Sequence, residues 1–171
     1  MKKEGIFSAL DLAKYICYMY YNKYKREISP IKLQKSLYFC FAYWGGYVRK
    51  NNKNKNFVEE RISLSEYLFD DTFKAWVYGP VIPDIFKKYK SKKIDYKDLD
   101  VDSIFYKTDI TVKEAIDSLL NELFEVSDFK LVSISHEDDC WKNHFDIFAD
   151  DHDEDIPSEE IINEYALRKT V

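Results

Sequence analysis

The strongest structural signal in this sequence is the run Ser29-Pro30-Ile31-Lys32-Leu33-Gln34-Lys35-Ser36-Leu37-Tyr38-Phe39. The Ser29 hydroxyl can cap free backbone amides, and Pro30 suits the first position of a helix because no donor is needed there. Beyond it, apolar residues recur every three or four positions along one side, namely Leu33, Leu37, Cys40, Phe41, Trp44 and Val48. The run therefore predicts a long helix, in which Gly45 and Gly46 either weaken the helix or admit a close neighbour.

Five further segments combine a helix-start signal with apolar residues at helical spacing. They begin at Ser8, Pro83, Thr111, Ser127 and Ser158, and Thr111 opens a capping box with Glu114. Alternation of polar and apolar residues within 62–77 predicts a small hairpin, and Tyr78-Gly79-Pro80 predicts a turn. The segments 50–56 and 90–109 are predicted to be loops. We expect a mainly α fold, a single-domain helical bundle of about six helices with a small β-hairpin over residues 1–171.

The composition is that of a folded intracellular protein. Apolar residues make up 46% and charged residues 33% of the chain, which is far from the disordered class. No apolar run approaches the roughly 20 residues that span a bilayer, and the N-terminal residues lack a secretory signal. Cys17, Cys40 and Cys140 are an odd number without paired spacing. We expect a cytoplasmic protein with reduced cysteines and no membrane partner.

Charge is divided unevenly along the chain. Residues 1–60 hold 12 Lys/Arg against 5 Asp/Glu, a net charge of +7, and the remainder holds 14 against 26, a net charge of −12. Two interpretations of the basic half are open: a basic aromatic strip that tracks single-stranded nucleic acid, or lysines that merely solvate the outer face of the long helix. The strip would consist of Lys32, Lys35, Tyr38, Tyr43 and Arg49. We favour the solvated face, because no nucleic-acid motif is present and the acidic half weakens attraction to phosphate.

His136, Cys140 and His144 form the one metal-like pattern, since their spacing by four would place them on one face of a continuous helix. Cys140 with either histidine could also be a nucleophile and its base, but the sequence specifies no orienting group and no oxyanion site. The chain has no phosphate-binding glycine motif, and adjacent acids such as Asp138 and Asp139 look like solvated or capping residues. We predict no enzyme and no cofactor, with a metal-dependent enzyme as an outside hypothesis.

Five sequence elements occur in a recognisable order. They are Asp11-Leu12-Ala13-Lys14-Tyr15-Ile16, the run at 29–39, Ala75-Trp76-Val77-Tyr78-Gly79-Pro80-Val81-Ile82-Pro83, Ser135-His136 followed by Trp141, and Ile156-Pro157 before the last helix. Together they resemble the Panacea antitoxin family, which includes SocA-like and phage-associated proteins. The likeness runs over nearly the whole chain. The chain departs from the family pattern in its aromatic first helix, in the segment 50–56 and in the acidic run 150–155. It also has Cys140 in place of the usual proline.

The resemblance implies a protein that neutralises a toxin by direct contact, in SocA-like members by delivering it to a protease. The shared residues then look like scaffold: Trp76 and Trp141 would fill core volume, and Gly79 and Pro80 would set a fixed turn. The full set comprises Lys32, Leu33, Gln34, Lys35, Tyr38, Phe39, Trp76, Tyr78, Gly79, Pro80, Pro83, His136 and Trp141.

Partner binding is expected on loops and exposed aromatic residues. Tyr18 and Tyr21 lie off the apolar stripe of the first helix, so they are either buried on a second side or presented to a partner. Four acids would meet a basic partner surface, namely Asp150, Asp151, Asp153 and Asp155. The partner is a cognate toxin or, alternatively, a host defence nuclease complex of the kind that anti-CRISPR proteins inhibit by imitating nucleic acid. The sequence fixes neither the partner's identity nor the oligomeric state.

Overall fold

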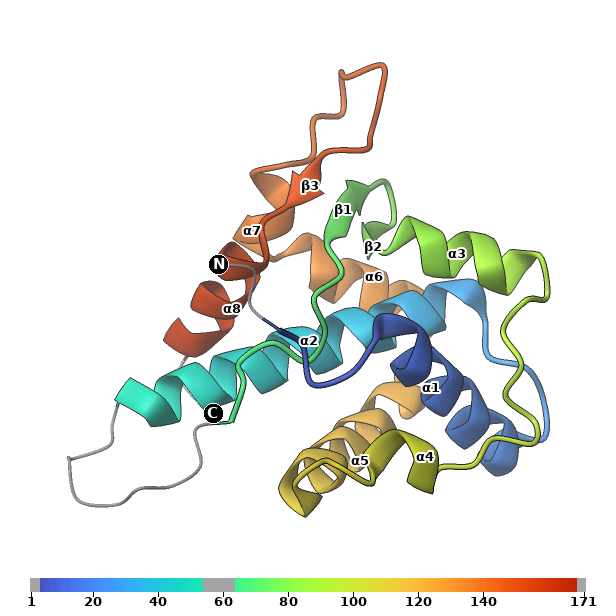
Figure 1. Ribbon diagram of the computed structural model, residues 1–171. Coiled ribbons are helices and arrows are strands. Elements are labelled where there is room, and N and C mark those ends of the chain that lie inside the picture. Colours follow the sequence, from blue (N-terminus) through green and yellow to red (C-terminus); the bar gives the residue numbers. More distant parts are fainter. Residues whose placement is uncertain (1–3, 54–63, 169–171) are drawn as a thin grey trace.

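A long central helix organises the fold. The computed structural model describes residues 4–53 and 64–168, and in this part of the chain it has eight helices and a three-stranded sheet. Figure 1 shows α2 (Pro30–Lys53) in the middle of the molecule, in contact with α1 (Ala9–Tyr24), α5 (Ile110–Glu125), α6 (Asp128–His136) and α8 (Ser158–Leu167). The predicted mainly helical fold with a small β-structure is confirmed.

Helix α2 begins as predicted but is buried on more than one side. The Ser29 hydroxyl accepts a hydrogen bond from the Lys32 amide at 3.0 Å, and every residue from 32 to 42 is buried. The solvated face predicted for Lys32 and Lys35 is therefore wrong, because the hairpin, α5 and α6 cover it. The helix also continues to Lys53, into the predicted loop, and the remainder of that segment lies outside the described residues.

The two adjacent glycines of α2 allow α8 to approach closely. A Cβ atom on Gly45 would lie 2.7 Å from the Ile162 side chain, and one on Gly46 would lie 2.7 Å from Tyr165. No larger residue fits at this crossing without moving α8. Of the two predicted roles for these glycines, close packing is the one that the structure bears out.

The other predicted helices start near the predicted positions, whereas the short helices at 102–105 and 139–142 were not predicted, and the first of them lies inside the segment 90–109 that was predicted to be a loop. Ser8 caps α1 through the Asp11 amide at 3.0 Å, and Ser127 caps α6 through the Lys130 amide. The cap of α5 is Asp109, which accepts from the Thr111 amide at 2.8 Å, so the predicted capping box at Thr111 is wrong. The other helices are α3 (Pro83–Lys90), α4 (Asp102–Phe105) and α7 (Asp139–Lys142). None of the described helices is both long and apolar enough to cross a membrane.

The small sheet joins the hairpin to a distant segment. Strands β1 (Phe73–Trp76) and β2 (Gly79–Val81) pair antiparallel, with Trp76 opposite Gly79, and β3 (Asp155–Ile156) pairs with the other edge of β1. The hairpin thus lies later in the chain than predicted, and the predicted turn at 78–80 includes most of β2. Gly79 has a φ of +96°, which favours glycine over any other residue.

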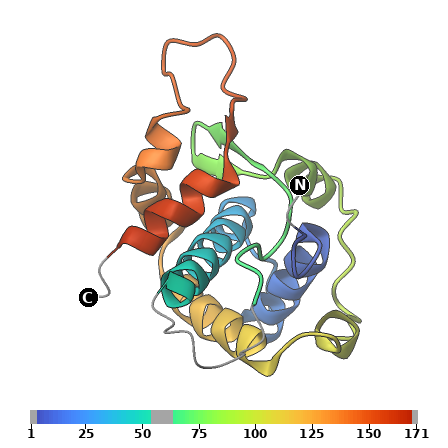
Figure 2. The same cartoon turned by 60° about the vertical axis from the view of Figure 1, so that its left-hand side comes forward.

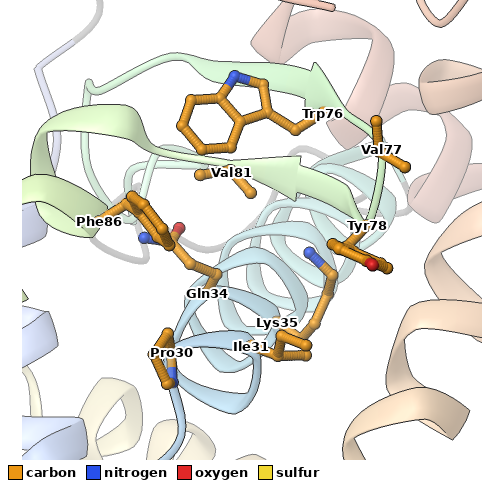
Figure 3. Close-up of a pocket in the computed structure, with 9 residues that line it drawn as sticks. All are labelled: Pro30, Ile31, Gln34, Lys35, Trp76, Val77, Tyr78, Val81 and Phe86. Atoms are coloured by element: carbon orange, nitrogen blue, oxygen red, sulfur yellow. The ribbon is translucent and has the colours of Figure 1, made fainter. Parts of the chain in front are cut away.

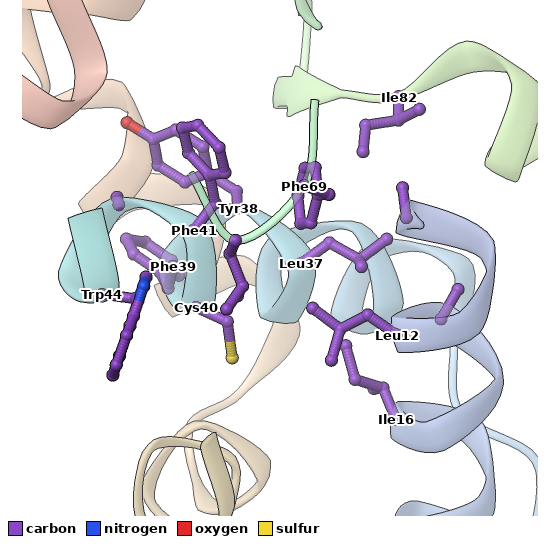
Figure 4. Close-up of a cluster of buried hydrophobic side chains, with 14 of the residues drawn as sticks. Leu12, Ile16, Leu37, Tyr38, Phe39, Cys40, Phe41, Trp44, Phe69 and Ile82 are labelled. Atoms are coloured by element: carbon purple, nitrogen blue, oxygen red, sulfur yellow. The ribbon is translucent and has the colours of Figure 1, made fainter. Parts of the chain in front are cut away.

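Aromatic and aliphatic side chains from the surrounding helices and from the sheet pack together around α2. Figure 4 shows Leu37, Phe41 and Phe69 packed in this cluster together with Leu12 and Ile16 of α1. The ring centroids of Phe41 and Phe69 are 5.0 Å apart. This continuous core holds the hairpin and the ends of α6 and α7 in fixed positions beside α2.

Candidate functional site

The residues of the sequence motifs meet around the β1–β2 hairpin. The Gln34 side chain accepts a hydrogen bond from the Ile82 amide at 2.9 Å and donates one to the Ile82 carbonyl at 3.2 Å. A buried glutamine that pairs with one backbone unit in both directions attaches the hairpin to α2 with a defined register. The motif at 32–39 therefore holds the motif at 75–83.

Lys35 makes the second link between α2 and the hairpin. Its amine donates to the Pro80 carbonyl at 2.9 Å, and the residue is 1% exposed. Among the described residues, no carboxylate lies within ion-pair distance of this amine. Burial lowers the Lys35 pKa to about 7, because a charged amine is poorly solvated there. Lys35 is consequently a buried cation without a counter-charge over part of the physiological pH range.

Two residues from the motif at 135–141 hold the turn of the hairpin. The Nε2 atom of His136 lies 2.9 Å from the Val77 carbonyl, and the indole of Trp141 donates to the Trp76 carbonyl at 3.0 Å. The rings of His136 and Trp141 stack with centroids 4.1 Å apart. Burial and the nearby charge of Lys35 lower the His136 pKa, which favours the neutral ring. We name this arrangement of motif side chains around residues 73–82 the hairpin clamp.

Gly79 lies under the hairpin clamp where no side chain fits. A Cβ atom there would be 2.4 Å from the Ser135 hydroxyl and 2.9 Å from Cε of Lys35. The predicted fixed turn is therefore present. The predicted core role holds for Trp141, which is buried, but not for Trp76, which is half-buried and donates from its indole to Asp153 at 3.0 Å.

A hollow of about 140 Å³ lies beside the hairpin clamp. Figure 3 shows it between the start of α2, the hairpin and α3, with the Lys35 side chain extending from α2 toward the hairpin. Its walls are almost wholly apolar, and Val77 and Tyr78 are exposed at the turn beside it. The lining residues are Pro30, Ile31, Gln34, Lys35, Trp76, Val77, Tyr78, Val81 and Phe86. We name it the hairpin pocket.

Tyr38, from the motif at 29–39, belongs to a second buried polar group. Asp138 is wholly buried and accepts hydrogen bonds from the phenols of Tyr38 and Tyr165, the latter at 2.7 Å, and from the Arg168 guanidinium. The prediction of a solvated Asp138 is thus wrong, because α2 and α8 enclose it; the residue does occupy the N-cap position of α7, but its side chain makes no capping bond there. The Cys140 thiol lies 3.3 Å from the Tyr38 phenol, and burial raises its pKa, so a thiolate nucleophile is disfavoured.

The structure does not bring His136, Cys140 and His144 together. Helix α6 ends at His136 and α7 begins at Asp139, so the three are not on one continuous helix. His144 instead lies between Glu154 at 2.6 Å and Glu160 at 2.8 Å. Burial opposes its charged form, but the two carboxylates outweigh burial and raise the His144 pKa. Within 4–53 and 64–168, no three His, Cys, Asp or Glu side chains are grouped to hold a metal ion.

A loop formed by residues 143–154 projects from the body between α7 and β3, as Figures 1 and 2 both show. Its base is held by Phe145, whose ring stacks between Trp141 at 4.6 Å and His152 at 4.9 Å. At its tip Ile147 and Phe148 are exposed, Phe148 to 91%. These two residues were not predicted to bind a partner, although two large apolar residues inside an acidic, non-periodic segment are a usable signal.

The four acids predicted to bind a partner divide into two pairs. Asp153 and Asp155 form ion pairs with Lys74 at 3.4 Å and 3.0 Å, and so help to hold the base of the loop. Asp150 and Asp151 are exposed near the tip and make no hydrogen bond or ion pair with any described residue. All four are exposed, and only the second pair makes no bond within the part of the chain that the structure describes.

Tyr18 and Tyr21 lie on α1, away from the projecting loop in both views of Figures 1 and 2. Both are half-buried against the core. The ring of Tyr21 packs on Tyr96 with centroids 6.0 Å apart, and the Lys97 amine lies 5.1 Å from it. The structure thus gives these tyrosines neighbours within the chain and does not join them to the loop.

Comparison with known protein families gives a match. The model of the family described as antitoxin SocA-like, Panacea domain, matches residues 33–142. No curated protein and no solved structure gave a match. The matched range contains Gln34, Lys35, His136 and Trp141, and hence the entire hairpin clamp, whereas the projecting loop follows it. The chain therefore belongs to the SocA-like antitoxin family with a Panacea domain.

Proposed function

We propose that this protein is an antitoxin that neutralises a cognate toxin by binding it directly, and that the tip of the projecting loop makes the contact. Membership of the SocA-like family supports the antitoxin role. The observation that carries the choice of surface is Phe148, whose side chain is 91% exposed. Solvent exposure of a large aromatic residue is unfavourable, and burying it against a partner stabilises the complex by about 1.5–3 kcal/mol.

The loop is built to bind with little loss of conformational freedom. Its base is fixed by the stack of Phe145 between Trp141 and His152 and by the bonds of Asp153 to Trp76 and Lys74. A surface that is already ordered before binding loses less entropy when the complex forms. The exposed Phe148 is thus an anchor on a supported loop.

The charge around the tip defines the chemistry of the partner. Asp150 and Asp151 directly follow the apolar tip in the chain and are exposed, so the complementary surface is an apolar pocket with a basic rim. A protein that imitates nucleic acid would instead bind mainly through extended negative charge. The apolar tip therefore favours a toxin over the nuclease complex considered from the sequence.

The test is growth rescue by pairs of variants. The candidate toxin is the product of the neighbouring open reading frame, co-expressed with this protein in an inducible system. We expect Phe148→Ala to lose rescue and to bind the purified toxin at least about tenfold more weakly. Phe129→Ala, at a residue 70% exposed on α6, is the matched control and should rescue as the wild type does. Full rescue by Phe148→Ala would exclude the loop tip as the contact.

The same experiment separates direct neutralisation from delivery to a protease. Toxin that is held inactive in a complex stays at a constant cellular level, whereas toxin that is delivered for degradation declines after synthesis is stopped. Measuring toxin level beside growth therefore decides which mechanism accompanies binding.

A further inference from the structure

We propose that the hairpin pocket captures the C-terminal residue of a partner polypeptide, with its carboxylate on the Lys35 amine and its apolar side chain against Trp76 and Phe86. This site is separate from the projecting loop and does not depend on the toxin proposed above. Its two requirements, an uncompensated cation and an apolar cavity of suitable size, both occur at the pocket.

The Lys35 amine supplies the charge. The Lys35 residue lines the pocket and is 1% exposed, and its amine donates a hydrogen bond to the neutral carbonyl of Pro80. A charged amine has three donors, so two remain for a ligand. A buried cation is costly unless it is paired with an anion. A carboxylate beside Lys35 would provide the counter-charge that no described residue provides.

The walls supply the apolar contact. The rings of Trp76 and Phe86 meet edge to face with centroids 5.4 Å apart, and Val81 and Ile31 complete the lining. A cavity of about 150 Å³ accommodates a benzene-sized group, and the hairpin pocket has a similar volume of about 140 Å³. It therefore fits one leucine or phenylalanine side chain rather than a larger ligand.

The surface beside the pocket favours a polypeptide over a free acid. Val77 and Tyr78 are exposed at the turn of the hairpin and extend the apolar surface outward from the pocket. The residues before a chain terminus would cover them, whereas a small carboxylic acid enclosed in the pocket would leave them in water. Capture of a terminal carboxylate is an established way of recognising peptides.

The charged and titratable groups around Lys35 give the proposal a defined pH dependence. The hairpin contributes the phenol of Tyr78, α6 contributes His136, and α2 itself contributes Lys32, which is bonded to the Phe124 carbonyl. Burial lowers the His136 pKa, so this ring stays neutral above pH 7. Since the Lys35 pKa is about 7, the amine loses its charge above that pH, and carboxylate binding should weaken by about tenfold per pH unit.

Calorimetric titration of the full chain with matched peptides tests the site. The probes are acetyl-Gly-Gly-Leu with a free carboxylate and the same peptide as its amide. At pH 6.5 we expect the acid to bind at least about tenfold more tightly than the amide, because a hydrogen bond to a charged group is lost. At pH 8.5 we expect that preference to shrink, with proton uptake on binding seen as a dependence of the heat on the buffer.

Variants at two buried lysines sharpen the result. Lys35→Met should abolish the preference for the acid, whereas Lys32→Met, on the same helix but outside the pocket, should keep it. If Lys35→Met fails to fold, the pH dependence of the wild-type protein still decides. Equal binding of acid and amide, or binding of neither, would overturn the proposal. Binding of free 4-methylpentanoate as tight as that of the tripeptide would overturn the assignment to a polypeptide terminus.

Discussion

Gln34 pairs with Ile82 across the interface between α2 and the hairpin, accepting from its amide at 2.9 Å and donating to its carbonyl at 3.2 Å. The two residues are 48 positions apart in the chain. The Ile82 carbonyl also accepts from the Phe86 amide at 3.1 Å, at the start of α3. One side chain of the long helix therefore positions the hairpin and the helix that follows it.

Replacement of this glutamine should weaken the fold measurably. In the Gln34→Leu variant the Ile82 carbonyl still accepts a hydrogen bond from the Phe86 amide, but the Ile82 amide is left buried without a partner. We expect a loss of about 1–3 kcal/mol in the free energy of unfolding, measured by urea denaturation. Amide hydrogen exchange at Ile82 should also accelerate. Unchanged stability and exchange would show that the pairing contributes little.

Two adjacent aspartates should respond very differently to the same change. Asp138 is buried beneath Tyr38, Tyr165 and Arg168, whereas the side chain of Asp139 is 80% exposed. We expect Asp138→Asn to destabilise the protein by about 3 kcal/mol, because an NH2 donor replaces one of the two accepting oxygens and the Arg168 guanidinium loses its counter-charge. Asp139→Asn should change stability by less than about 0.5 kcal/mol. Thermal unfolding of both variants at pH 7 makes the comparison, and equal losses would contradict it.

His144 should make stability depend on pH. Its pKa in the folded protein is raised above 6.5 by Glu154 and Glu160, so its contribution is fully present below pH 6.5 and is lost as pH rises through the raised pKa. Lys35 acts in the opposite direction, because its folded pKa of about 7 lies below its unfolded value. The quantity to measure is therefore the difference in unfolding free energy between wild type and His144→Gln from pH 5.5 to 8.5. We expect it to shrink with rising pH.

The free acids of the projecting loop should control the rate of association with the toxin. Asp150→Asn with Asp151→Asn removes two exposed charges, and we expect association to slow about threefold at low salt and to lose much of its salt dependence. The control is Asp95→Asn with Asp98→Asn, two exposed acids outside the loop. Surface plasmon resonance at several salt concentrations gives the rates. Equal rates for the two pairs would exclude the electrostatic role.

The positions of the helices were largely predictable because their start signals are local. Ser8, Ser29 and Ser127 each accept from an amide three residues ahead, so sequence spacing alone specifies the bond. The start of α5 was misplaced because Asp109 and Thr111 are both good caps, and local pattern does not rank them. The two-residue strand β3 carries too little pattern to be seen in a sequence.

The environment of the polar motif residues was decided only by tertiary structure. Lys35 bonds to a carbonyl 45 residues away, Lys32 to one 92 residues away, and Tyr38 to a carboxylate 100 residues away. A lysine that lies between apolar residues of a helix is predicted to be exposed to solvent unless the segment that covers it is known. Local hydrogen bonds and periodic apolar side chains thus determined the helices from the sequence, whereas burial and charge at the hairpin clamp arose from distant segments packing together.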